Sequence, residues 1–310
     1  MKPVYMINGF LESGKTEFIN FTLSQPYFRA KGTTLLIVCE EGENAYDEKL
    51  LKKTKTVMEV IDDREQFTPQ NLLELEKKTN AERIIVEFNG MWNPKEIVYP
   101  VHWEVEQQIT IINGATFPMY YNNMKSLVAE QVRNSELIIF NRCDGIEDLA
   151  SYKRNVKAVN PKADIVFEGK DGEINQIFED DLPYDLSSDE LVLDNQGYGI
   201  WYIDSMDNLQ RYEGKTVVFD AMVMIPKGFP AGCFVPGRMA MTCCADDMAF
   251  IGYACKYDKA SELTQKSWVR VKAVVKREYF SDYKGEGPVL YAVSVTPTTK
   301  PEDDVIGFGA

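Results

Sequence analysis

Apolar positions in the first half of the chain come in short runs that are separated by longer amphipathic stretches. The runs are rich in Val, Ile, Leu and Phe, which is typical of strands buried inside a sheet. They predict strands at residues 4–7, 34–38, 83–88, 109–112, 137–140 and 164–167. The stretches between them predict helices at residues 15–23, 69–77, 122–132 and 146–155. This alternation over about 170 residues predicts an α/β fold with a doubly wound, mainly parallel sheet.

The second half of the chain has a different pattern. After an acidic, glycine-containing stretch, partial alternation of Val, Tyr, Phe and Met predicts strands at residues 216–225, 249–255, 268–276 and 289–296. Several short strands within about 100 residues indicate a small all-β domain, an OB-like barrel. We therefore expect four parts: a domain at 1–170, an acidic linker at 171–210, a small β-barrel at 211–298 and a C-terminal tail at 299–310.

Composition narrows the function classes. A chain of 310 residues has room for two domains that each bury a core. The 48 acidic residues against 34 basic ones give a net charge of −14, which argues against nucleic acid or an anionic membrane as the partner. We see no signal peptide and no apolar stretch near the roughly 20 residues of a membrane span. The expected location is the cytoplasm, where cysteines are thiols or metal ligands.

The first predicted strand leads directly into Gly-Phe-Leu-Glu-Ser-Gly-Lys-Thr at residues 9–16, the phosphate-binding pattern G-x-x-x-x-G-K-[ST]. Gly9 and Gly14 let the backbone turn its N–H groups towards phosphate oxygens. Lys15 is expected to reach the β- and γ-phosphates, and the Thr16 hydroxyl to ligate Mg²⁺. The helix that follows would place the phosphates at its N-terminus. The predicted nucleotide contacts here are Gly9, Glu12, Ser13, Gly14, Lys15, Thr16 and Glu17.

Two other predicted strands end in acidic residues. The strand at 83–88 runs into Glu87-Phe-Asn-Gly90, where the carboxylate can hold the water shell of Mg²⁺ and the glycine can approach the γ-phosphate. The strand at 34–38 is followed by Cys-Glu-Glu-Gly-Glu at 39–43. Its glutamates fit either a solvated charge run or a switch segment, and we choose Glu40 as the residue that senses the γ-phosphate.

The strand at 137–140 ends in Asn141-Arg142-Cys143-Asp144, which resembles the N-K-x-D guanine motif. In that motif the aspartate accepts hydrogen bonds from the two N–H groups on the guanine edge, and adenine is rejected because it leaves the carboxylate unpaired. The alternative is that Asp144 caps a helix that starts near residue 146. His102, the single histidine, fits a structural role better than that of a ligand.

In this order and spacing, the segments resemble the CobW-type GTPases, the CobW/HypB/UreG class of P-loop NTPases. The resemblance covers about residues 1–168 and includes NGFLESGKT, LIVCEEGENAYDEKLL, IIVEFNG, EQVRNSELIIFNRCD and NPKAD. It implies a Mg²⁺-dependent GTPase with slow intrinsic turnover and a role in metal homeostasis or metal insertion. The implied partners are GTP and GDP, a metalloprotein client or a transporter component. Lys15, Thr16, Glu40 and Glu87 would carry the reaction.

The chain departs from that family's pattern at two points. Arg142 stands where the guanine motif usually has lysine, and a planar guanidinium differs from an ammonium in shape and hydrogen bonding. The family's Cys-x-Cys-Cys metal motif has no counterpart, because no cysteine occurs between residues 46 and 92. The second departure favours an alternative function, a GTP-dependent protein-interaction switch that transfers no metal.

A group of cysteines lies late in the chain. Cys243 and Cys244 are followed by Asp246, and thiolates with a carboxylate suit Zn²⁺ or another soft divalent metal. The alternative, which the sequence supports equally well, is that the thiols pack as small hydrophobic groups in a barrel core. Residues 212–296 resemble the C-terminal domain of YcgQ-type bacterial proteins, through Arg238, the Cys-Cys-x-x-Asp sequence and Trp268. This resemblance favours a metal site. The sequence leaves open whether the protein forms oligomers.

Overall fold

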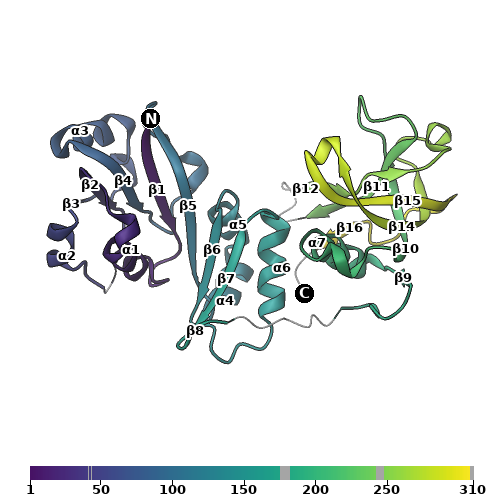
Figure 1. Cartoon of the computed structure of the whole chain (residues 1–310), viewed down its shortest axis with the longest axis horizontal. Coiled ribbons are helices and arrows are strands. Elements are labelled where there is room, and N and C mark those ends of the chain that lie inside the picture. Colours follow the sequence, from purple (N-terminus) through teal and green to yellow (C-terminus); the bar gives the residue numbers. More distant parts are fainter. Residues whose placement is uncertain (41, 43, 175–181, 242–247, 308–310) are drawn as a thin grey trace. The chain divides into compact units, whose positions relative to one another are not determined.

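The computed structural model describes residues 1–40, 42, 44–174, 182–241 and 248–307. The chain divides into two compact units, one formed by Met1–Leu149 and Lys162–Ile177 and the other by Ala150–Pro161 and Phe178–Ala310. Each unit has its own sheet (Figure 1). Among the helices that the structure describes, none is both long and apolar enough to pass through a bilayer.

The first sheet has the strand order β3-β2-β4-β1-β5-β6-β7-β8, and its neighbours pair in parallel apart from β7 with β8. Its strands are β1 (Lys2–Asn8), β2 (Thr33–Val38), β3 (Thr56–Val60), β4 (Ala81–Glu87), β5 (Trp103–Asn113), β6 (Leu137–Asn141), β7 (Asp164–Gly169) and β8 (Gly172–Glu173). β4 and β5 lie on either side of β1. The loop after β1 therefore lies at a topological switch point, where open α/β sheets bind their ligands.

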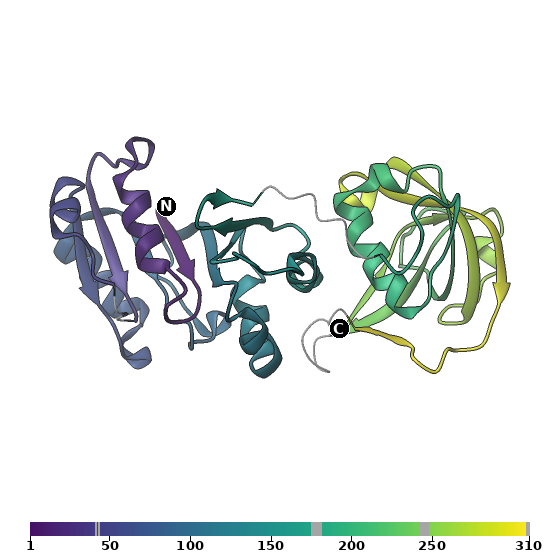
Figure 2. The ribbon, with the colours of Figure 1, turned by 90° about the horizontal axis from the view of Figure 1, so that it is seen from below.

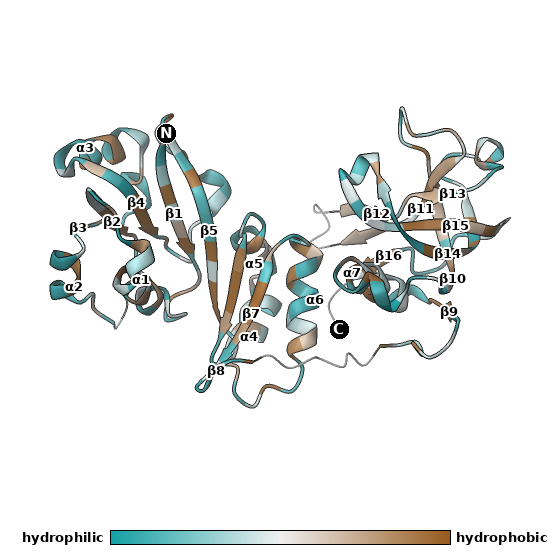
Figure 3. Cartoon of the chain, in the orientation of Figure 1, coloured by the Kyte–Doolittle hydropathy of each residue, from teal (hydrophilic) through white to brown (hydrophobic). Residues whose placement is uncertain are grey.

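Helices cover both faces of this sheet. They are α1 (Lys15–Ser24), α2 (Glu48–Lys53), α3 (Pro69–Thr79), α4 (Phe117–Asn123) and α5 (Lys125–Val132). The helix α6 (Leu149–Val159) follows β6 along the chain, and its residues from Ala150 onward belong to the second unit. Alternate residues of β2 belong to two different core clusters, since successive side chains of a strand point to opposite faces. Leu36 packs in the cluster that contains Ile19 of α1, whereas Leu35 packs with Leu72 of α3. Hydrophobic colouring is accordingly concentrated on strands such as β4 and β6 (Figure 3).

The strands of the second unit pair in a closed cycle. β10 (Thr216–Met224) pairs with β11 (Cys233–Met241), β11 with β13 (Cys255–Lys256), β13 with β15 (Gly285–Pro297), β15 with β14 (Trp268–Phe280), and β14 again with β10. β9 (Glu190–Val192), β12 (Met248–Gly252) and β16 (Val305–Gly307) add to this cycle. The strands curve around one another (Figure 2). The second unit is thus β-rich and separate, and its assignment to the OB type stays a prediction.

One helix contributes to the core of the second unit. Asp194 is the N-cap residue of the helix α7 (Asn195–Asp207), and its carboxylate accepts a hydrogen bond of 2.7 Å from the Gly197 N–H. Its Tyr198 and Trp201 are fully buried against Phe219 of β10. The range predicted as a linker, 171–210, therefore includes a strand and a helix whose side chains lie in this core.

Several elements differ from the sequence-based expectation. The predicted helix at 122–132 is two helices, because the backbone leaves the helical region at Met124. The predicted helix at 146–155 begins at Leu149. The pattern missed the helices α2 and α7, the strands β3 and β11, and the short strands β8, β9, β13 and β16. Short 3₁₀ helices join the elements: η1 (Pro26–Phe28), η2 (Arg64–Gln66), η3 (Pro94–Glu96), η4 (Leu209–Arg211), η5 (Ala260–Glu262) and η6 (Ser281–Tyr283).

Candidate nucleotide-binding site

The loop between β1 and α1 has the backbone that its sequence predicts. Gly9 and Gly14 have φ angles of 139° and 100°, in the region that favours glycine. Glu12 also has a positive φ, at 60°. The Ser13 N–H donates to the Phe10 carbonyl at 3.1 Å, which closes the turn before α1 begins. The N-terminus of α1 therefore faces the hollow of the loop, the arrangement that binds phosphate in other proteins.

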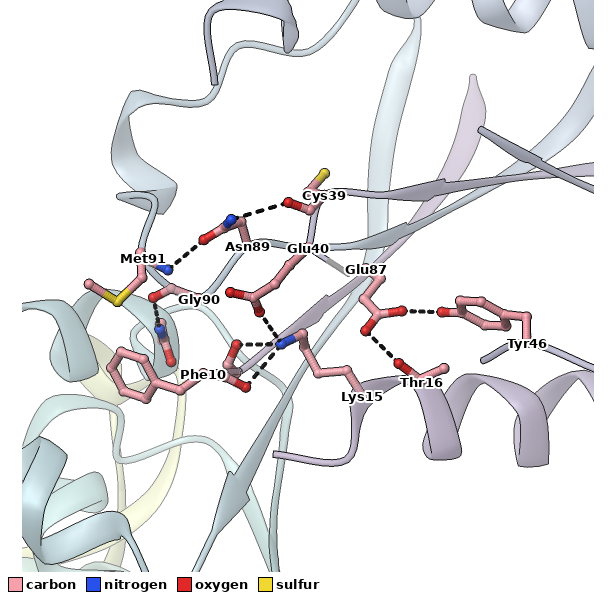
Figure 4. Close-up of polar contacts among 12 residues, drawn as sticks. Phe10, Lys15, Thr16, Cys39, Glu40, Tyr46, Glu87, Asn89, Gly90 and Met91 are labelled. Atoms are coloured by element: carbon pink, nitrogen blue, oxygen red, sulfur yellow. Dashed lines mark hydrogen bonds and ion pairs between the residues drawn. The ribbon is translucent and has the colours of Figure 1, made fainter. Parts of the chain in front are cut away.

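Lys15 is 4% exposed, and all its N–H donors have acceptors within the chain. Its Nζ donates to the carbonyls of Gly9 and Phe10 at 2.9 and 3.0 Å and to Glu40 Oε2 at 2.8 Å (Figure 4). An ammonium group has three donors, so this set is complete. Glu40 thus lies directly beside the loop lysine, and its role as the residue that senses the γ-phosphate stays a prediction.

Thr16 and Glu87 meet on the other side of the loop. The Thr16 hydroxyl donates to Glu87 Oε1 at 2.9 Å, and the Tyr46 hydroxyl donates to Glu87 Oε2 (Figure 4). Glu87 is 3% exposed. Burial raises the pKa of its carboxyl above the ordinary value, although the hydrogen bonds from Tyr46 and Thr16 oppose that shift. The same burial raises the pKa of the Tyr46 hydroxyl, so it stays a donor at neutral pH.

Gly90 lies against the phosphate-binding loop. A Cβ at this position would be 2.4 Å from the Gly9 carbonyl oxygen and 2.5 Å from the Cα of Phe10, so only glycine fits without movement. The buried Gln131 of α5 donates from Nε2 to the Gly90 carbonyl at 2.6 Å. The Gln131 carbonyl also accepts a hydrogen bond from Asn8 at the end of β1. Gln131 therefore anchors both loops, a role that no sequence motif indicated.

The predicted base-reading residues line a second part of the site. Asn141 Nδ2 donates to the Ser13 carbonyl at 2.7 Å, and Arg142 donates to the Glu12 carbonyl at 2.9 Å. Both Asp144 carboxylate oxygens accept from the Lys170 N–H, at 3.1 and 3.0 Å. Because α6 begins only at Leu149, Asp144 is not at its N-cap position.

A cavity of about 520 Å³ opens beside these residues. Its lining comes from α1, from the ends of β5, β6 and β7, and from the loops that follow them, and consists of Gly14, Glu17, Phe18, Phe21, Ile111, Ile139, Asn141, Arg142, Asp144, Glu168, Gly169 and Lys170. Pockets for small organic ligands range from about 300 to 1,000 Å³ and combine apolar walls with a few polar groups. This cavity has both properties.

Two buried atoms in the site have no hydrogen-bond partner among the residues that the structure describes. They are Ser13 Oγ and Asn141 Oδ1. Buried polar atoms are nearly always paired in native structures, so these atoms fit a site that a ligand completes. Thr16 and Glu87 offer hydroxyl and carboxylate oxygens, the donor type that Mg²⁺ prefers. The residues present therefore fit a magnesium nucleotide.

The predicted thiolate site lies outside the described residues, because Cys243, Cys244 and Asp246 all fall in 242–247. The same is true of Glu41 and Glu43 in the predicted switch segment. Of the other late cysteines, Cys233 and Cys255 are buried free thiols. Within the ranges that the structure describes, no three His, Cys, Asp or Glu side chains gather as a metal site.

The parallel sheet and the loop together define a P-loop nucleotide-binding protein. Residues 3–167 match the family described as CobW/HypB/UreG, nucleotide-binding domain, and this is more than half of the chain. The chain therefore belongs to the CobW/HypB/UreG family of P-loop GTPases, which is related to metal-handling GTPases. Residues 170–306 match the DUF1980 C-terminal domain.

Two solved structures are similar to part of the chain. The Zn(II)-bound YjiA GTPase from E. coli is 17% identical with a TM-score of 0.42, covering 56% of this chain and 59% of that one. The hydrogenase maturation factor HypB from Archaeoglobus fulgidus is 18% identical with a TM-score of 0.41, covering 56% and 84%. The chain thus spans less than two thirds of the YjiA chain. No curated protein matched the chain.

Proposed function

We propose that this protein is a Mg²⁺-dependent GTP-binding protein and a slow GTPase whose nucleotide state controls metal insertion or metal homeostasis. The observation that carries the nucleotide half is the row of polar groups at the strand ends of the first sheet. Lys15 and Thr16 follow β1, Glu87 ends β4, and Asn141 ends β6. These strands are parallel, so their carboxyl ends share one edge of the sheet.

Each residue of this row has a role in the proposal. Lys15 and the loop amides stabilise charge on the γ-phosphoryl group, and Thr16 with Glu87 holds Mg²⁺, which supplies charge neutralisation when bound. Asp144, in the cavity, accepts from the guanine edge. Glu40 senses the γ-phosphate. We assign no arginine to the γ-phosphate, and slow turnover without a partner follows from that.

The metal half rests on the family and on the predicted thiolate group of Cys243, Cys244 and Asp246. The second unit would hold Zn²⁺ or another soft divalent metal there, and a metalloprotein client or a transporter component would receive it. The closed strand cycle, with β13 parallel to β15, supports an OB-like barrel for this unit. The location that we expect is the cytoplasm.

The second candidate is a GTP-dependent interaction switch that transfers no metal. The lack of any cysteine between residues 46 and 92 favours it, because the family's cysteine motif belongs there. Metal content of the protein purified without chelator separates the two. Stoichiometric soft metal that is lost in a Cys243→Ala, Cys244→Ala variant supports the metal-handling function, and metal-free protein supports the switch.

Competition between nucleotides tests the nucleotide half. A fluorescent GTP analogue is bound in the presence of Mg²⁺ and displaced with unlabelled GTP or ATP. We expect GTP to displace the analogue at concentrations at least 100-fold lower than ATP, because adenine leaves the Asp144 carboxylate unpaired. Equal displacement by ATP contradicts the guanine assignment.

A further inference from the structure

Both oxygens of the Glu87 carboxylate are held by hydroxyl groups of the chain. Thr16 donates to one at 2.9 Å and Tyr46 to the other (Figure 4). Thr16 belongs to the phosphate-binding loop, whereas Tyr46 lies between β2 and α2. The Tyr46 contact was not indicated by any motif, and it places a phenol hydroxyl directly on the carboxylate assigned to the magnesium ion.

The room around these groups is small. The cavity bordered by Lys15, Thr16, Glu40 and Glu87 has a volume of about 20 Å³. A single water molecule needs a cavity of about 10–15 Å³ when the volume is measured in the same way. Mg²⁺ usually keeps several waters of its octahedral shell, besides the phosphate oxygens that it binds. A hydrated ion with phosphates is larger than this cavity, so we expect side chains beside it to move when the ion binds. Tyr46 is not part of the cavity lining, but it holds Glu87, which is.

We propose that Tyr46 gates the magnesium site. In the structure its hydroxyl donates to Glu87 Oε2, and a water of the Mg²⁺ shell needs the same carboxylate when a magnesium nucleotide binds, so the Tyr46 hydroxyl and the shell of the ion compete for Glu87. The inference rests on the proposed function, since it concerns the same nucleotide site. The gate couples ion binding to the position of the segment that carries Tyr46.

Glu40 contacts the lysine assigned to the phosphates, as Tyr46 contacts the carboxylate assigned to the magnesium ion. Its carboxylate pairs with Lys15 at 2.8 Å, and both side chains are nearly buried. A phosphate oxygen needs a donor from the same ammonium, whose other two donors are held by backbone carbonyls. Tyr46 therefore acts on the ion and Glu40 on the phosphate, and the two effects are separable.

The test uses Tyr46→Phe in the full chain, with Tyr27→Phe as its matched control because Tyr27 is 79% exposed. Binding of a non-hydrolysable fluorescent GTP analogue is measured against Mg²⁺ concentration, and thermal unfolding is followed with and without Mg²⁺ and analogue. We expect the half-saturating Mg²⁺ concentration to fall about tenfold in Tyr46→Phe, which is the effect of one hydrogen bond to a charged group. Its melting temperature should fall in the nucleotide-free form more than in the loaded form.

Glu40→Gln gives a second, independent readout. It should strengthen analogue binding in EDTA while the half-saturating Mg²⁺ concentration stays the same. An unchanged or higher half-saturating Mg²⁺ concentration in Tyr46→Phe overturns the gate, as does an equal loss of melting temperature in both forms. A wild-type chain that binds no analogue at any Mg²⁺ concentration overturns the proposed function itself, so the two failures are distinguishable.

Discussion

Buried charges have different surroundings in the two units. In the first unit, Lys15 begins α1 and Glu87 ends β4, and both border the same cavity. Their partners include the side chains of Glu40 and Tyr46. In the second unit, Arg238 is 3% exposed and donates to the backbone carbonyls of two other segments, at 3.3 and 2.6 Å, and to the Asn195 side chain at the start of α7.

Asp204 of α7 is likewise held by groups of its own unit. It is 8% exposed and accepts from the hydroxyl of Tyr212, which lies in the core, and from the side chains of Asn208 and Arg211. A side-chain partner beside a cavity can be replaced by a ligand, whereas a partner inside a packed core is lost only when the core opens. The comparison separates polar groups that serve binding from polar groups that serve folding.

The largest expected effect concerns the folding side of this comparison. Trp201 is fully buried and contacts Tyr198, Phe219 and Tyr253. Trp201→Ala leaves a cavity in the aromatic core, and we expect it to lower the free energy of unfolding of the second unit by about 3–5 kcal/mol. Denaturant unfolding measures the loss. Binding of a GTP analogue to the folded variant should be unchanged, and a weakened affinity would break the comparison.

Lys15→Ala gives the next largest effect, on the binding side. The variant loses the loop ammonium that we assign to the β- and γ-phosphates, so we expect analogue affinity to fall on the order of 100-fold. Fluorescence titration measures it. The unfolding of the second unit should stay at its wild-type midpoint, because Lys15 belongs to the first unit. Wild-type affinity in this variant would exclude the loop as the nucleotide site.

The smallest expected effect concerns a residue of the candidate site, Cys143, that serves folding rather than binding. Burial raises the pKa of the Cys143 thiol to about 11. Above its ordinary pKa of 9.0 the unfolded chain loses a proton that the folded chain keeps, so the free energy of unfolding falls as pH rises from 9 to 11. The slope from this thiol is at most about 1.4 kcal/mol per pH unit.

Urea unfolding at pH 8, 9 and 10 measures that slope, and Cys143→Ala is the control. The slope should be smaller in the variant than in the wild type. Equal slopes would mean that Cys143 does not titrate with unfolding. In that case the Cys143 thiol, which lies between Asn141 and Asp144 of the candidate site, would not contribute to the pH dependence of folding stability.

The sequence predicted the central strands of the first sheet because they are buried on both faces. β2 and β6 read as continuous apolar runs, and both were predicted within one residue of their bounds. β3 was missed because it lies at the edge of the sheet, where Val57, Met58 and Val60 are exposed and the pattern is mixed. A strand can be predicted from its hydrophobic pattern only when its side chains are buried, and the side chains of edge strands are buried less than those of central strands.

In the second unit, local signals conflicted with the tertiary context. β11 contains Pro236 and Gly237, which usually argue against a strand interior. The helix α7 contains Gly197 and Gly199 and is buried on several sides, so it shows no amphipathic pattern. Packing against the aromatic core decides both elements, and a single sequence does not display that packing.

The candidate site divides in the same way. Lys15, Thr16 and Glu87 were found because each belongs to a motif with a fixed spacing. Tyr46 and Gln131 were not found, since their contacts join segments that are 41 residues apart along the chain in both cases. Such residues become visible only when the fold brings the segments together.

The contact of Gly90 with the phosphate-binding loop has an evolutionary consequence. Two segments about 80 residues apart meet here with no space for a methyl group, so any amino-acid substitution at position 90 alters the shape of the loop. Gly9 is under the same restriction, because a Cβ there would be 2.2 Å from a carbonyl oxygen of β5. Descendants of this gene can vary the neighbouring side chains, but we expect both glycines to persist in every lineage that keeps the loop.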